Sequence, residues 1–94
     1  MDDIATRRRQ RFREVFPEGL FYHATAPLES LSSFTGGLDG PERDFVDDLV
    51  YEMTTPKPPT RRGRSLVFCG HRATLKHLGG EFYTLAVRRV PRNS

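Results

Sequence analysis

The segment Phe21-Tyr22-His23-Ala24-Thr25 carries the residue types best suited to chemistry in this 94-residue sequence. It places an imidazole near the end of a short apolar run, followed by a small residue and a hydroxyl. An imidazole can donate and accept hydrogen bonds, and its charge changes near neutral pH. A plainer interpretation is that His23 is half-buried and bonded to the backbone. On this segment alone, both interpretations stay open.

A second group of chemically active side chains consists of arginines gathered in three stretches. One stretch lies near the N-terminus, one in a Pro-rich segment, and the third consists of Arg88, Arg89 and Arg92. Guanidinium groups suit phosphates and acidic protein surfaces, although an Arg-rich helix is also commonly a solvated face. The candidate partner-binding residues are Arg7, Arg8, Arg9, Arg11, Arg13, Arg61 and Arg62.

The charges of the chain are unevenly distributed around a net charge of +3. Residues 17–52 hold eight acids and one base, whereas residues 53–94 hold nine bases and one acid. The acidic segment would repel a phosphate backbone lying across it, so the favoured partner is a protein with an acidic surface. Nucleic acid is the alternative partner, and an oligomer held by complementary charge is a third interpretation.

The composition limits the class of protein. The length predicts one domain, residues 1–94, with a core over 19–90. No apolar run approaches the roughly 18 residues of a membrane span, and no signal-peptide core is present, so no membrane contact and a cytoplasmic location are expected. The single cysteine, Cys69, excludes an internal disulfide and a Cys-based zinc site, and no metal is expected.

Apolar periodicity and the positions of proline and glycine predict an α/β or α+β domain with a small three-stranded sheet and packed helices. Residues 54–63 are expected to form a flexible Pro/Arg loop. Gly79-Gly80 is expected to cap the C-terminus of a helix. The strand at 20–24 is expected to be covered on both faces. The strand at 81–90 is expected to be covered on both faces as far as Arg88. The order is helix, strand, short helix, helix, strand, short helix and strand, over residues 2–16, 20–24, 27–34, 41–53, 65–69, 71–78 and 81–90.

With this order of elements around it, the His23 segment resembles the first strand of ADP-ribosyltransferase-like domains of the His-Tyr-Glu type. In that family a Tyr-His-Gly-Thr strand opens the NAD pocket. Leu66-Val67-Phe68-Cys69 resembles the second strand of the family, and residues 82–90 resemble the third. The resemblance covers about residues 19–90 and implies an abbreviated transferase fold that binds NAD or a nucleotide. It also implies transfer of ADP-ribose to a macromolecular acceptor as the candidate activity.

The resemblance also assigns roles within one cleft between the first two strands. Cleavage of the nicotinamide–ribose bond passes through an oxocarbenium-like state, so the pocket must hold the ribose and place a carboxylate nearby. By resemblance, His23 would bond a ribose hydroxyl, and the Ala24 backbone and Thr25 hydroxyl would contact the nicotinamide amide. Phe68 would supply an aromatic ring, and Arg64 or Arg72 would meet the pyrophosphate.

The catalytic carboxylate is where the sequence departs from the family. The family's acid lies beyond its third strand, whereas this chain ends at Ser94. Glu81 is the sole acid in residues 53–94 and therefore the candidate catalytic residue, although the family places none at the start of this strand. A truncated chain, a site completed by another subunit, and a fold without the reaction all stay open. Transfer by this chain is expected to be weak or absent, and whether it is an enzyme stays open.

The remaining histidines and the cysteine have structural interpretations. His71 and His77 are expected on the surface of the predicted short helix. Cys69, at a strand end, is expected to be a small buried hydrophobic residue. The alternative function is therefore a non-enzymatic protein whose arginine clusters bind and regulate a partner, such as a nucleic-acid-handling machine, or nucleic acid.

Overall fold

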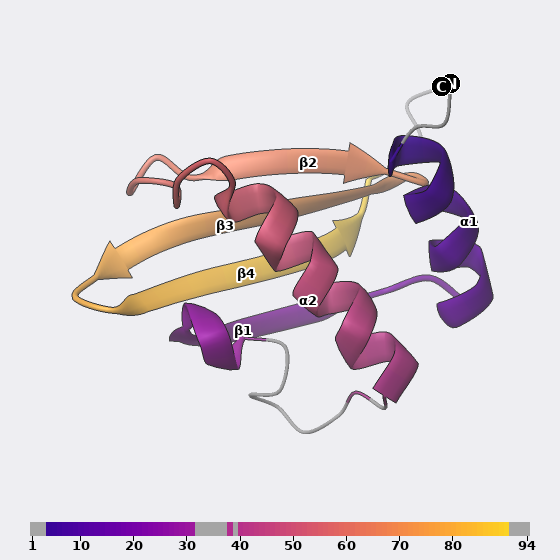
Figure 1. The fold of residues 1–94 in the computed structure, drawn as a ribbon, viewed down its shortest axis with the longest axis horizontal. Helices are drawn as coiled ribbons and strands as arrows, with labels where there is room; N and C mark the ends of the chain where they lie inside the picture. Colours follow the sequence, from indigo (N-terminus) through magenta and orange to yellow (C-terminus); the bar gives the residue numbers. More distant parts are fainter. Residues whose placement is uncertain (1–3, 32–37, 39, 91–94) are drawn as a thin grey trace.

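An antiparallel four-stranded sheet and two α-helices make up the described part of the chain, a small α+β domain (Figure 1). The computed structural model describes residues 4–31, 38 and 40–90. Residues 2 and 3 of the predicted N-terminal helix, and Phe34 of the predicted short helix, lie outside these ranges. The elements are α1 (Ile4–Val15), β1 (Tyr22–Pro27), a 3-10 helix (Leu28–Ser30), α2 (Gly40–Thr54), β2 (Arg64–Phe68), β3 (His71–Gly79) and β4 (Phe82–Arg89).

The spatial order of the strands differs from their order in the chain. The sheet runs β1-β4-β3-β2, so β1 and β2 form its opposite edges. Between them in sequence, α2 lies across one face of the sheet, and α1 stands at one end of the same face (Figure 1). The chain thus crosses the helix-covered face to reach the far edge, and two hairpins then fill the interior of the sheet with β3 and β4.

The predicted helix over residues 71–78 is wrong, because this segment is β3. Its side chains alternate with a period of two: His71, Ala73 and Leu75 are buried, while Arg72 and Lys76 are exposed. This alternation is the pattern of a strand with one covered face. The predicted three-stranded sheet is therefore a four-stranded one.

Two tight turns explain why residues 64–89 fold as consecutive hairpins. Cys69 and Gly70 both have positive φ angles, 48° and 74°, which is the conformation that two-residue hairpin loops require. Gly79 ends β3 and Gly80 begins the next turn, with φ angles of 137° and 57°, so this pair does not cap a helix. A bulge between His77 and Gly79 adjusts the pairing of β3 with β4 at this turn.

The core lies on one side of the sheet only. Leu75 and Leu85 of the central strands are fully buried beneath α2, whose buried residues recur at helical spacing. Phe12 of α1 brings this helix into the core, with its ring centroid 5.6 Å from that of Phe45 and 5.3 Å from that of Phe68. The expectation that β1 and β4 are covered on both faces is therefore wrong, since their burial alternates. Within the described ranges, no helix has the length and apolar character to cross a membrane.

Candidate functional site

The sheet face opposite the helices, here called the open sheet face, gathers polar and basic side chains from all four strands. These side chains are exposed or half-buried. The side chains that alternate with them along each strand point to the other face and are mostly buried against the helices. Its strand residues are His23 and Thr25 of β1, Thr84, Ala86 and Arg88 of β4, Arg72, Thr74 and Lys76 of β3, and Ser65 and Val67 of β2. This set contains no acidic residue, so every charged group on it is basic.

Two arginines on this face lie directly opposite one another. The register of the central strands pairs Arg72 with Arg88, and both side chains are exposed. Lys76 adds a third cation two side chains further along the same face of β3. None of the described residues forms an ion pair or a hydrogen bond with these three cationic side chains. Like charges directly opposite in a sheet destabilise the pair, so this arrangement costs stability unless an anion lies on it.

Hydroxyls and an imidazole lie along both edge strands of the open sheet face and on the strands next to them. The Thr25 hydroxyl donates to the Thr84 hydroxyl at 3.2 Å, and the Thr84 hydroxyl lies 3.4 Å from Nε2 of His23. Ser65 and Thr74 form a second hydroxyl pair, at 3.2 Å. These groups provide a surface of donors and acceptors between the two edges of the sheet.

Exposed apolar side chains border the basic residues. Phe21, directly before β1, is 83% exposed, and Val67 of β2 is 59% exposed. Phe82, at the start of β4, is 49% exposed and pairs with Pro27 of β1. The two phenylalanines therefore lie near opposite ends of the β1–β4 pair, with the hydroxyl groups between them.

The structure brings together only some of the residues assigned to an NAD pocket. His23, Thr25 and Arg72 share the open sheet face, whereas Ala24 and Phe68 are buried on the helix-covered face. Because β4 and β3 lie between β1 and β2, His23 and Phe68 do not line one cleft between the first two strands. Phe68 instead belongs to the aromatic part of the core.

Two further predicted residues also lie apart from His23. The Arg64 guanidinium donates to the Met53 carbonyl at 2.7 Å, which ties β2 to the end of α2. Glu81 is exposed in the turn between β3 and β4, at the end of the sheet away from Arg72 and Arg88. The described residues therefore do not form one pocket that contains Arg64, Glu81 and His23.

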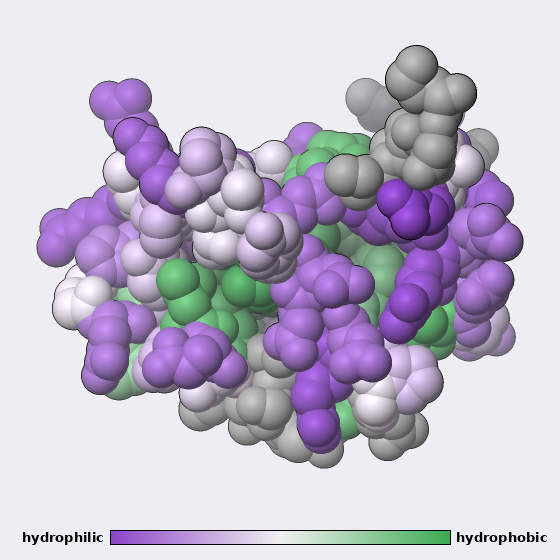
Figure 2. Space-filling view, viewed as in Figure 1, coloured by the Kyte–Doolittle hydropathy of each residue, from purple (hydrophilic) through white to green (hydrophobic). Residues whose placement is uncertain are grey.

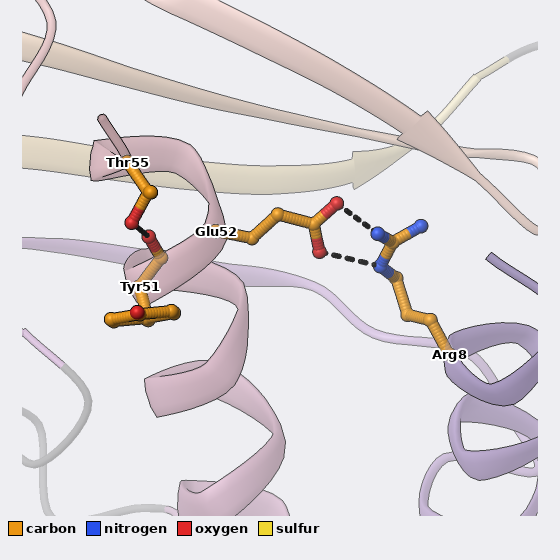
Figure 3. Close-up of polar contacts among 4 residues, drawn as sticks. All are labelled: Arg8, Tyr51, Glu52 and Thr55. Carbon is orange, nitrogen blue, oxygen red and sulfur yellow. Dashed lines mark hydrogen bonds and ion pairs between the residues drawn. The ribbon is translucent and has the colours of Figure 1, made fainter. Parts of the chain in front are cut away.

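The predicted partner-binding arginines belong to the helix layer or to a turn. Arg8 of α1 forms a two-pronged ion pair with Glu52 of α2, with Nε 3.1 Å from Oε1 (Figure 3). Its role is therefore to join the helices. Arg61 and Arg62 are exposed in the turn before β2. The other arginines of α1 are exposed and share the helix layer with the acidic residues of α2: Arg7, Arg9, Arg11 and Arg13.

The acidic residues of α2 lie on the side of the sheet away from the open face. Asp44, Asp47 and Asp48 are exposed on this helix, which covers the other face (Figure 1). A phosphate chain on the open sheet face would therefore not lie across them. The acids of α2 are therefore separated from this face by the sheet itself. The alternation of exposed and buried side chains in residues 71–78 is the sequence signal that could have revealed the face.

His71 and Cys69 lie beside a separate hollow of about 710 Å³ at the end of the sheet near α1. His71 is buried, not on a helix surface as expected: its Nδ1 donates to the Cys69 carbonyl at 2.9 Å, and its Nε2 accepts from the Leu20 amide at 3.2 Å. Both ring nitrogens are thus occupied by backbone. Cys69 is partly exposed in its turn instead of being buried, and His71 is not free to act as its base. Across the described ranges, no His, Cys, Asp or Glu cluster could hold a metal ion.

No protein-family model, curated protein or solved structure matches this chain. The resemblance to ADP-ribosyltransferase-like domains therefore stays a prediction from the sequence, and the function must be argued from the geometry.

Proposed function

We propose that the protein binds single-stranded nucleic acid on the open sheet face. The observation that carries this proposal is the opposed pair Arg72 and Arg88, which has Lys76 beside it and no carboxylate partner among the described residues. A phosphate chain between these cations would relieve their repulsion and release condensed counterions.

Aromatic side chains favour a single strand over a duplex. Phe21 and Phe82 are exposed near opposite ends of β1 and β4, where unpaired bases can stack on them. Stacking on such side chains is possible only for bases that are not paired within a helix, and it tolerates any sequence. Thr25, Thr84 and His23 lie between them and can bond sugar or phosphate oxygens.

The form of the open sheet face, and not its charge, favours this ligand over a protein partner. Both would have to be anionic, but the open sheet face is a broad surface with dispersed hydroxyls and aromatic edges, which matches a sugar–phosphate chain with bases. NAD shares this phosphate and base chemistry, and His23 and Thr25 lie on this same face. NAD is therefore included in the test as a competitor.

The test is fluorescence anisotropy with a labelled short oligouridylate and with a duplex of equal length, each titrated over a range of salt concentrations. The oligouridylate should bind more tightly than the duplex. Replacing two cations together, Arg72→Gln with Arg88→Gln, should flatten the plot of log K against log salt by about 1.4, at about 0.7 for each lost phosphate contact. Phe21→Ser should lower the affinity and leave this slope unchanged.

The matched control removes the same charge from the helix layer, by Arg9→Gln with Arg13→Gln. It should retain the slope of the wild-type protein. Equal losses in both double variants would show only an effect of net charge and contradict the proposed face. An absence of oligouridylate binding even at low salt would overturn the proposal, as would tighter binding to the duplex. Displacement by NAD at low concentration would favour the nucleotide-pocket prediction instead.

A further inference from the structure

The groove between α1 and α2 is a second surface, on the opposite side of the sheet from the open face. It encloses about 720 Å³ and is lined by both helices. Phe45 and Leu49, which belong to the core, form its apolar floor. Figure 2 shows hydrophobic surface between the hydrophilic side chains of the two helices.

The walls of this groove carry opposite charges. The wall from α1 is basic on balance, because Arg7, Arg8 and Arg11 outnumber Glu14, while Asp48 and Glu52 make the wall from α2 acidic. The ion pair between Arg8 and Glu52 joins the walls (Figure 3). The side chain of Arg8 in this pair is only 13% exposed, so the spacing between the helices is held from within.

A large aromatic side chain projects at the rim of the groove. Tyr51 lines the groove and is 71% exposed, and its carbonyl accepts a hydrogen bond from the Thr55 hydroxyl at 2.7 Å (Figure 3). Tyrosines in such positions are among the residues that most often anchor protein interfaces. The same surface therefore presents both a projection and a hollow with an apolar floor.

We infer that a second copy of this chain docks on the helix layer, with Tyr51 of each copy in the groove of the other. In a two-fold interface the same patch occurs on both subunits, so it must complement itself. A two-fold axis along the groove brings the basic wall of one copy against the acidic wall of the other. Arg11 then faces the partner's Asp48, and the projection of each copy meets the hollow of its partner.

A dimer of standard size would bury about 800 Å² on each partner. Because the helix layers face each other, both open sheet faces would point outward, and the dimer would present two independent faces to a ligand. This inference does not depend on what those faces bind.

Sedimentation velocity over a range of protein concentrations tests the inference directly. The wild-type chain should shift from monomer to dimer as its concentration rises. Tyr51→Ala should raise the dimer dissociation constant about tenfold or more. The matched control, Phe21→Ala, removes an exposed aromatic ring that precedes β1 and does not line the groove, and it should leave association unchanged.

Charge reversal tests the pairing of the two walls. Arg11→Glu and Asp48→Arg should each weaken the dimer, and the two together should restore it, because both opposed pairs are then rebuilt with reversed sign. Circular dichroism of every variant confirms that the helices and sheet are retained. A chain that stays monomeric at millimolar concentration would overturn the inference. So would a dimer that survives Tyr51→Ala but is lost in Phe21→Ala, or a double reversal that does not restore association.

Discussion

On the helix-covered side of the sheet, two arginines have partners within the protein: Arg8 meets Glu52, and Arg64 donates to a carbonyl of α2. On the open side, Arg72 and Arg88 oppose each other without a described partner. Arginine therefore stabilises the fold on one face, while on the other face its guanidinium groups have no described partner and can bind an anion. Arg8 and Arg64 are therefore part of the architecture, whereas Arg72 and Arg88 are the candidates for recognition.

Neighbouring residues of β3 give the largest contrast between the faces. Leu75 is fully buried, so Leu75→Ala should reduce the free energy of unfolding by about 2–5 kcal/mol through lost transfer energy and a cavity. Lys76 follows it on the open sheet face and is exposed, so Lys76→Ala should change stability by no more than about 0.5 kcal/mol. Urea denaturation of both variants measures the difference. Similar losses at the two positions would show that something covers the open face.

Two histidines give the next contrast. His71→Leu should cost about 1–3 kcal/mol, because it leaves the buried Leu20 amide without its acceptor and removes the donor to the Cys69 carbonyl. His23 is exposed on the open sheet face, so His23→Leu should be nearly neutral in the same urea titration. If His23→Leu proved the more harmful of the two, the buried imidazole would not be a structural element.

The smallest contrast concerns the arginines themselves. Arg8→Gln should lower stability by about 1 kcal/mol, since it leaves a partly buried carboxylate without its guanidinium partner. Arg72→Gln should leave stability unchanged or raise it slightly, because it removes one of two opposed like charges. Thermal unfolding at low and high salt provides the measurement, and the Arg72 effect should shrink as salt screens the repulsion. A clear loss of stability in Arg72→Gln would mean that this residue has an internal partner.

Much of the fold could be predicted from local patterns. The apolar residues of α2 recur at helical spacing from Phe45 to Met53, and this helix was predicted at nearly its observed bounds. Strand β4 was also predicted at nearly its observed bounds, because successive side chains from Phe82 to Val87 alternate between two faces. The helix predicted over residues 71–78 was wrong because Gly79-Gly80 fits both a helix C-cap and a hairpin turn. The alternation of Arg72 and Lys76 with buried neighbours is the pattern that indicates a strand.

The sequence by itself determined the local choices: helical or extended backbone, the glycines at the turns, and the blocks of acidic and basic charge. Only the tertiary structure decided which groups meet. The pairing of β1 with β4 brings His23 beside Thr84, sixty-one residues later, and separates it from Phe68 by two strands. The helices cover only one face, which places the acids of α2 away from Arg72 and Arg88. Local periodicity shows which side chains share a face of a strand, but strand order and the face covered by the helices depend on how distant segments pack.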